Sequence, residues 1–242
     1  MPVLILGARS DIGLAVARRF ARDGHPLQLA ARNAIGLADD AADMALRHGV
    51  AVTLHEFDAL ACGGHAAFVA SLPELPGIAV CCVGLLGDQI ENERDIAAAT
   101  LVLRSNFEGP ASVLAALANA FAARGSGTLV GISSVAGERG RASNYVYGAA
   151  KAGFTAFLSG LRNRLTRHGV QVISVLPGFV ATRMTAGLAL PARLTAQPEA
   201  VADAIASAVR RRCDVVYVLP VWRIIMAVIR LIPEPLFKRM RL

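Results

Sequence analysis

Val3-Leu4-Ile5-Leu6-Gly7-Ala8-Arg9-Ser10-Asp11-Ile12-Gly13 is the stretch of sequence that decides the fold. Its first four residues form an apolar run that predicts a buried strand. Apolar residues then recur at helical spacing up to Gly24, at Ile12, Ala15, Val16 and Phe20. A glycine-rich turn between a strand and a helix favours phosphate binding, because the backbone can approach the ligand and the helix N-terminus offers free N–H groups. The stretch therefore predicts a dinucleotide site at residues 7–13.

Further apolar runs alternate with helical patterns along the chain. The strands expected after the first lie at Leu27–Ala31, Val50–Phe57, Ile78–Val83, Thr128–Ser133, Val170–Leu176 and Val215–Leu219. This alternation predicts βαβ units with right-handed crossovers. The expected fold class is α/β, a single-domain doubly wound parallel sheet of the Rossmann type. Residues 1–219 form the dinucleotide-binding and catalytic domain, and residues 220–242 a basic, apolar tail of the same domain.

A second group of residues is suited to acid–base catalysis. Tyr147 and Lys151 are four residues apart and so share one helix face, and Ser134 lies 13 positions upstream of the tyrosine. A phenol has an ordinary pKa of about 10. A neighbouring ammonium favours the phenolate and moves that pKa toward neutrality, where the group is useful in acid–base catalysis. Ser134 follows an expected strand, and strand ends face the ligand crevice in open α/β sheets.

These residues together resemble the short-chain dehydrogenase/reductase family, over roughly residues 3–219. Gly7 and Gly13 match the outer glycines of the family motif Gly-x-x-x-Gly-x-Gly, while Asp11 takes the place of the middle one. We expect Asp11 in the first helical turn, stabilised by the helix dipole. The resemblance implies an enzyme that moves a hydride between a nicotinamide cofactor and a carbonyl, and a homodimer or homotetramer.

The resemblance also implies the catalytic roles. Ser134 would hold the substrate carbonyl oxygen, and Tyr147 would donate a proton to it. Lys151 would bind the nicotinamide ribose and lower the tyrosine pKa. Asn106, in Ser105-Asn106-Phe107, matches the family asparagine that positions a water beside the lysine.

Several residues are implied as cofactor contacts. Asp58 would contact the adenine, unless it is only a helix cap. Gly84 matches the glycine of the family's Asn-Asn-Ala-Gly motif, although Cys81-Cys82-Val83 lacks the asparagines. The loop Pro177–Thr182 would close over the nicotinamide, and residues 183–197 would form a substrate lid. The full set is Gly7, Arg9, Ser10, Ile12, Gly13, Arg32, Asp58, Gly84, Pro177, Gly178, Val180 and Thr182.

Charges near the second strand favour NADP(H) over NAD(H). An acidic residue at its end would bind the ribose 2′-hydroxyl, whereas arginine accommodates a 2′-phosphate. Ala31 occupies the usual acidic position, Arg32 follows it, and Arg9 lies in the glycine loop. Arg183 is either a further anion contact or a solvated side chain.

Amino-acid composition limits the partners and the cellular location that we expect for this chain. The chain has 242 residues, 55% hydrophobic and 18% charged, with a net charge of +7. Aromatic residues are few and do not interleave with basic runs, so no nucleic-acid partner is expected. The positive charge fits a solvated basic surface, a cofactor phosphate site or an anionic membrane surface. The spacing of the four cysteines suits no zinc site, no signal peptide is expected ahead of the first strand, and no apolar run would span a bilayer. We therefore expect a cytoplasmic protein without a metal.

The tail has its own pattern. Residues 221–232 are apolar except for Arg223 and Arg230, a proline pair then breaks the pattern, and Lys238, Arg239 and Arg241 follow. A short apolar helix with a tryptophan and a basic end is typical of an interfacial membrane segment. Packing against a second subunit and simple core packing are the alternatives.

Three stretches resemble one subgroup of the family, which reduces a polyprenyl-phosphoryl 2-keto-pentose. They are residues 84–88, residues 135–144 and the tail after Leu219. The expected substrate is accordingly a lipid-linked keto-sugar. A general keto-reductase for acyl or other apolar ketones is the first alternative. A cofactor-binding regulatory protein without turnover is the second.

Overall fold

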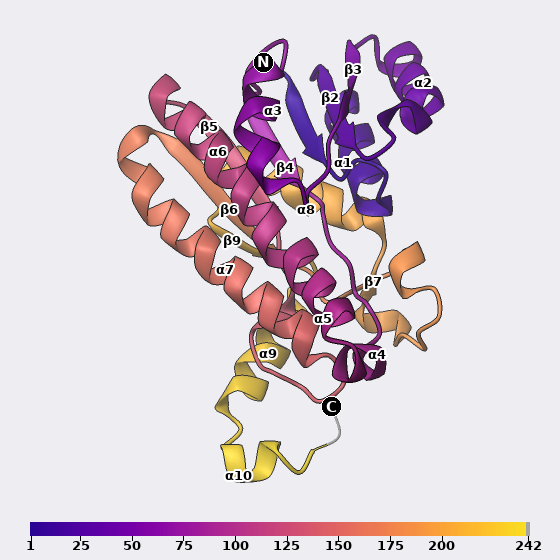
Figure 1. Cartoon of the computed structure of the whole chain (residues 1–242), viewed down its shortest axis with the longest axis vertical. Helices are drawn as coiled ribbons and strands as arrows, with labels where there is room; N and C mark the ends of the chain where they lie inside the picture. Colours follow the sequence, from indigo (N-terminus) through magenta and orange to yellow (C-terminus); the bar gives the residue numbers. More distant parts are fainter. Residues whose placement is uncertain (241–242) are drawn as a thin grey trace.

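A seven-stranded parallel sheet forms the centre of the computed structural model, which describes residues 1–240. The strand order is β3-β2-β1-β4-β5-β6-β9 (Figure 1). Every neighbouring pair runs parallel. The strands are β1 (Val3–Leu6), β2 (Leu27–Ala31), β3 (Val52–Glu56), β4 (Ile78–Cys81), β5 (Gly127–Ile132), β6 (Val170–Leu176) and β9 (Val215–Tyr217). The predicted doubly wound α/β fold is confirmed.

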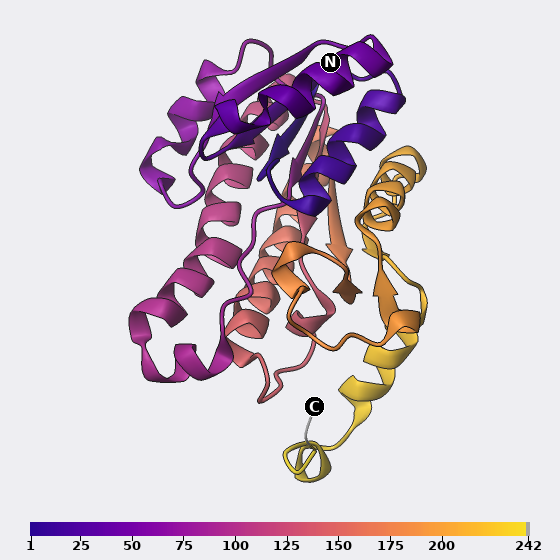
Figure 2. The same cartoon turned by 90° about the vertical axis from the view of Figure 1, so that its right-hand side faces the viewer.

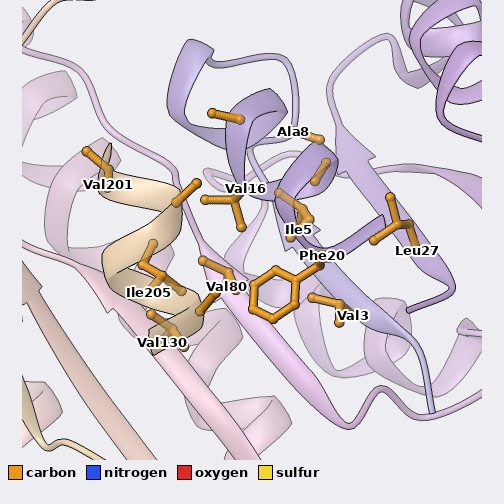
Figure 3. Close-up of a cluster of buried hydrophobic side chains, with 14 of the residues drawn as sticks. Val3, Ile5, Ala8, Val16, Phe20, Leu27, Val80, Val130, Val201 and Ile205 are labelled. Atoms are coloured by element: carbon orange, nitrogen blue, oxygen red, sulfur yellow. The ribbon is translucent and has the colours of Figure 1, made fainter. Parts of the chain in front are cut away.

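Helices cover both faces of the sheet. One face carries α1 (Asp11–Arg22), α2 (Ala38–His48) and α8 (Pro198–Arg211), and the other carries α3 (His65–Ser71), α6 (Gly109–Arg124) and α7 (Tyr145–Leu165). Figure 3 shows the core on the first face, where Val16 and Phe20 of α1 and Ile205 of α8 lie over strand valines. Burial on both faces explains why the strands read as continuous apolar runs.

Four strands end earlier than their sequence patterns predict. β3 stops at Glu56, β4 at Cys81, β5 at Ile132 and β9 at Tyr217. Asp58, Gly84 and Ser134 therefore lie in the loops beyond the sheet's carboxyl edge, and not within the strands. Pairing stops there because the backbone must leave the sheet to enter the next helix. These loops are where an open α/β sheet binds its ligand.

Smaller elements complete that edge. α4 (Gln89–Arg94) and α5 (Ile96–Leu103) precede a π-helical turn at Arg104–Glu108, which continues into α6. β7 (Phe179–Val180) and β8 (Thr195–Ala196) form a separate two-stranded sheet that brackets the expected lid. Single turns of 3-10 helix lie at Ala34–Leu37, Cys62–Gly64, Val135–Gly137, Thr166–His168, Arg183–Thr185 and Ala192–Leu194.

The C-terminal segment extends beyond the body of the molecule. α9 (Val221–Leu231) follows β9, and α10 (Glu234–Phe237) lies at the far end in both views (Figures 1 and 2). No helix among the described residues is long and apolar enough to cross a membrane. The basic residue Arg241 of the predicted tail lies outside the described residues.

Candidate active site

The glycine loop is built by close contacts between β1 and α1. Gly7 has φ +79°, and a Cβ there would lie 3.0 Å from the backbone nitrogen of Val83. Ser10 caps α1: its hydroxyl accepts from the Gly13 N–H at 3.0 Å and donates to the Gly7 carbonyl at 2.8 Å. A Cβ at Gly13 would lie 2.6 Å from the Gly7 carbonyl oxygen. The loop therefore requires both glycines and holds the N-terminus of α1 at the edge of the sheet, where a pyrophosphate fits.

Asp11 lies at the start of α1, as predicted, but its carboxylate is turned toward the lid. It accepts from the backbone N–H of Arg183 at 2.6 Å and from the Arg183 guanidinium at 2.8 Å. The same guanidinium donates to the Arg9 carbonyl at 2.5 Å. The acidic side chain thus connects the glycine loop to the segment that follows β7. Arg183 thus pairs with Asp11 while its side chain stays 73% exposed, which agrees with the solvated alternative, and its contact with an anion stays a prediction.

A hollow of about 540 Å³ lies beside the glycine loop and is lined by Arg9, Arg32 and Asp58. Arg9 donates to the Arg32 carbonyl at 3.4 Å, so the two arginines lie together at the end of β2. The Asp58 carboxylate accepts from the Leu60 N–H at 2.9 Å, so it closes a turn as well as lining the hollow. The nearby Glu56 carboxylate is held by backbone N–H groups of Ala34 and Asn33, which lower its pKa. The site that would hold the adenosine phosphate is thus lined by three arginines, since Arg183 also borders it.

Ser134, Tyr147 and Lys151 line one cavity of about 170 Å³. Tyr147 is hydrogen-bonded to Ser134. The Lys151 ammonium donates to the Ile132 carbonyl at 3.0 Å and lies 5.7 Å from the centroid of the Tyr147 ring. The loop after β5 supplies the serine, and the first two turns of α7 supply the other two side chains. This arrangement places a hydroxyl, a phenol and an ammonium around one small volume.

Burial controls the pKa values of the site. It raises the pKa of Tyr147 to about 12, while the hydrogen bond with Ser134 acts in the opposite direction. It lowers the pKa of Lys151 to about 8. The sequence predicts that Lys151 lowers the tyrosine pKa, and the structure does not show this. The physical reason is that the ammonium is directed at the Ile132 carbonyl and the phenol is enclosed by apolar walls.

Asn106 is fixed by hydrogen bonds to the nearby backbone. It is fully buried in the π-helical turn. Its amide nitrogen donates to the carbonyls of Leu85 at 2.6 Å and Val102 at 2.8 Å, and its amide oxygen accepts from the Leu85 N–H at 3.2 Å. These bonds hold the backbone of residue 85, and none reaches Lys151. A Cβ at Gly84 would lie 3.1 Å from that amide oxygen and 3.6 Å from the lysine nitrogen, so Gly84 fills the space between them.

The loop after β6 forms the opposite wall of the cavity. Pro177, Gly178, Val180 and Thr182 all line it, as does Ile12 from the glycine loop. The Val180 carbonyl accepts from the Thr185 hydroxyl at 2.7 Å, and that hydroxyl also accepts from the N–H of Thr182 at 3.1 Å. The start of the lid is therefore fixed to the loop that is expected to close over the nicotinamide.

The two hollows meet at Gly84, which lines both of them. Every predicted cofactor residue except Gly13 lines one hollow or the other. Gly13 lies behind the loop instead, where it packs against the Gly7 carbonyl. The predicted contacts therefore lie along one crevice, with Gly13 shaping the loop that borders it.

Trp222 is a wall residue that the sequence pattern did not identify. It projects from α9 into the cavity lining, its indole N–H donates to the Leu194 carbonyl at 3.1 Å, and its ring meets Phe179 edge-on. A Cβ at Gly178 would overlap the indole ring. One face of α9 is therefore core packing against the site. The chain's single tryptophan, placed just after the last strand, was the only available signal.

The other face of α9 is exposed. Ile224, Val228 and Leu231 are 68%, 59% and 82% exposed. Ion pairs tie the segment to the loop before α7, with Arg230 pairing Glu138 at 3.4 Å and Arg139 pairing Glu234 at 2.6 Å. The tail is thus fixed in place while it presents an apolar outer face.

Comparisons with known proteins agree on one family. The short chain dehydrogenase family model matches residues 2–191. An uncharacterized oxidoreductase of Mycobacterium tuberculosis is 43% identical over 242 residues, covering 99% of this chain and 96% of the relative. The acetoacetyl-CoA reductase of Allochromatium vinosum is 29% identical over 223 residues, covering 84% and 88%. A short-chain dehydrogenase from Sphingobium yanoikuyae in complex with NADPH superposes with a TM-score of 0.82 at 26% identity, covering 100% and 97%.

Proposed function

Because this chain belongs to the short-chain dehydrogenase/reductase family, an NAD(P)-dependent class of oxidoreductases, we propose that it uses NADPH to reduce the ketone of a lipid-linked 2-keto-pentose. The observation that carries the proposal is the meeting of Ser134, Tyr147 and Lys151 in one cavity beside the glycine loop. A non-catalytic role is set aside, since the relatives are oxidoreductases.

The chain's own residues supply the acid–base chemistry. Bound NADPH would supply the hydride. The Ser134 hydroxyl would orient the carbonyl oxygen, and the Tyr147 phenol would donate its proton to that oxygen as it gains charge. Lys151 lies close enough to support the phenolate that remains. A hydride added to carbon and a proton added to oxygen together convert the ketone into an alcohol.

Two arginines support the preference for NADP(H). Arg9 and Arg32 line the hollow next to the glycine loop, and Ala31 leaves no carboxylate where a ribose 2′-hydroxyl would be bound. Guanidinium groups bind phosphate through charge-assisted hydrogen bonds. The NADPH in the Sphingobium structure, at 26% identity, is in keeping with this choice.

The cavity walls support an apolar substrate. Val135, Leu188 and Trp222 line the site, and α9 brings an apolar segment directly to it. A polyprenyl chain would need such a surface. The acetoacetyl-CoA reductase relative favours the second candidate, a keto-reductase acting on an acyl thioester. Ser134, Tyr147 and Lys151 keep the same roles in both.

The same proposal places the enzyme at the inner face of a membrane. The exposed apolar face of α9 and the exposed basic residues Arg223, Lys238 and Arg239 suit an anionic lipid surface. A homodimer or homotetramer in the cytoplasm, in peripheral contact with that membrane, is the expected working form.

The decisive experiment follows NADPH oxidation with a synthetic polyprenyl-phosphoryl 2-keto-ribose. Conversion to the arabinose epimer is expected, and Tyr147→Phe should lower the rate by about 100- to 10,000-fold because it removes the general acid. NADPH binding, measured by fluorescence, should persist in that variant. Tyr145→Phe is the matched control, since Tyr145 lies on the same helix and is 46% exposed. If the protein reduced acetoacetyl-CoA but not the lipid-linked keto-sugar, the proposed substrate would change to an acyl thioester.

The cofactor preference has a separate test. Arg32→Gln should weaken NADPH binding by about 10- to 100-fold, the effect of losing one charge-assisted bond to the 2′-phosphate, and should change NADH binding far less. Fluorescence titration of both cofactors measures the two constants. Arg18→Gln, an exposed arginine on α1 paired with Asp40, is the control. Equal losses for both cofactors would contradict the assignment of Arg32 to the 2′-phosphate.

A further inference from the structure

Arg141 stands at the cavity without a partner. Its side chain lines the active-site cavity, and its Nε atom is buried without a hydrogen bond among residues 1–240. Burial lowers the pKa of this guanidinium, and no carboxylate of the described chain pairs with it. Arg141 is half-buried, and a guanidinium partly removed from water without a counter-charge is unfavourable for a fold. Its presence beside the catalytic residues therefore calls for an anion that the chain itself does not supply.

Two neighbouring arginines, unlike Arg141, have partners for their guanidinium groups. Arg139 pairs with Glu234 and lies over the Phe237 ring at 4.1 Å, and Arg230 pairs with Glu138. Arg141 is two residues from Arg139 and has no such arrangement. Asn144, in the same loop, also lines the cavity, and its side-chain oxygen is buried without a partner in the described chain. Both residues thus line the cavity, and each has a side-chain atom that the described chain leaves unpaired.

Arg141 also borders a second hollow. This hollow, of about 280 Å³, is lined by Phe237, Lys238 and Met240 of the C-terminal segment and by Arg141 itself. Arg141 therefore borders both the reaction cavity and this second hollow, whose lining combines the apolar side chains of Phe237 and Met240 with the charged side chains of Lys238 and Glu234.

We infer that Arg141 binds the phosphate ester of the substrate and thereby selects a ketone joined through phosphate to an apolar chain. The ketone lies at Tyr147, the phosphate at Arg141, and the chain follows the hollow beside Phe237 and Met240. Lys238 adds a second positive charge at that hollow. The inference rests on the proposed reduction and names the group of the substrate that sets specificity.

Binding of simple probes tests this assignment without turnover. Trp222 is the only tryptophan and lines the cavity, so its fluorescence reports occupancy directly. Farnesyl phosphate and farnesol differ only in the phosphate. In the NADPH-bound wild type, farnesyl phosphate should bind about 10- to 100-fold more tightly than farnesol, the effect of one charge-assisted bond.

Matched variants complete the design. Arg141→Gln should abolish the preference for farnesyl phosphate, and Arg141→Lys should retain part of it because the charge remains. Arg167→Gln, an exposed arginine beyond the other end of α7, should retain it fully. Thermal unfolding of each variant verifies that it is folded before the titrations are compared.

An unchanged preference in a folded Arg141→Gln protein would overturn the inference. Coenzyme A serves as a third probe that carries phosphate without an isoprenoid chain. Binding of coenzyme A that depends on Arg141, with no such dependence for farnesyl phosphate, would also overturn it. If the preference is as expected but no ketone is reduced, the proposed function fails and the Arg141 assignment stands.

Discussion

At the scale of single residues, burial sets the protonation state of Tyr147. Burial raises its pKa to about 12, so the phenol keeps its proton throughout the physiological range. A protonated phenol can donate to a carbonyl oxygen, whereas oxidation of an alcohol needs the phenolate. The residue as it is placed here is therefore suited to reduction.

Lys151 gives a measurable pH dependence of stability. Its folded-state pKa is about 8, below the ordinary value of 10.5, so between these pH values the unfolded chain holds more protons than the folded one. The free energy of unfolding of the wild type should therefore rise with pH across this window, by about 3 kcal/mol relative to Lys151→Met. Urea unfolding of both proteins at about pH 7.5 and pH 10.5, on either side of the window, measures the difference.

The exposed lysine of the tail provides the comparison. Lys238→Met removes an ammonium from the surface and should follow the wild-type curve. If the wild type and Lys151→Met showed parallel pH profiles, the lysine would be solvated in the folded protein and the described burial would be wrong.

Sequence spacing predicted which side chains meet in the cavity because short-range geometry positions them. Tyr147 and Lys151 share a helix face by their spacing alone, and Ser134 follows a strand whose end must face the crevice. The bond between Asp11 and Arg183 joins residues 172 positions apart, and no local pattern encodes such a contact. For the same reason the amide partners of Asn106 could not be read from a helix pattern.

At the scale of elements, α9 packs one face against the wall of the site and so makes the C-terminal segment part of that wall. Trp222 and Met226 are buried against Val135 and Leu176, while the opposite face has no cover among the described residues. The sequence predicted the helix almost to the residue, because its apolar pattern and the following prolines are local signals. The sequence left open whether the apolar face of this helix contacts a membrane, a second subunit or the core, because hydrophobicity alone does not distinguish these partners.

Gly178→Ala tests the contact between the loop and α9. The added methyl would overlap the indole of Trp222, so the ring or the helix must move. Overpacking of this kind costs about 1–3 kcal/mol. We expect a lower free energy of unfolding and a red-shifted Trp222 emission, measured by urea titration and fluorescence.

A second glycine substitution gives the baseline. Gly160 lies on the exposed face of α7, and an added methyl group there would meet no other atom within 4 Å. Gly160→Ala should therefore stabilise the helix by up to about 1 kcal/mol. Equal effects of the two alanines would mean that Trp222 does not rest on Gly178.

At the scale of the whole molecule, charge and exposed apolar surface gather at the C-terminal end. The chain carries a net charge of +7, and the exposed face of α9 lies in the segment that extends beyond the sheet (Figure 2). An amphipathic segment with basic flanks binds anionic bilayers in two ways: its apolar face is buried in the lipid, and its basic residues attract the anionic headgroups. The exposed face of α9 would then meet the lipid, while Trp222 on its buried face lines the site cavity.

Vesicle co-sedimentation measures this association. Ile224→Glu together with Val228→Glu should reduce binding to phosphatidylglycerol-containing vesicles by more than about 10-fold, because two apolar side chains are replaced by charges of the wrong sign. Added salt should weaken wild-type binding. Ile35→Glu is the control, because Ile35 is 74% exposed on a turn outside the tail. Equal sedimentation of all three proteins would leave the outer face of α9 to a second subunit.

The packing of Trp222 on Gly178 also limits how this sequence can drift over generations. A side chain cannot arise at position 178 while the indole is in place, and the indole cannot be lost without uncovering the wall of the site. Descendants that discard the terminal helix should therefore be those that have gained bulk at position 178. The two positions are therefore expected to change together or not at all.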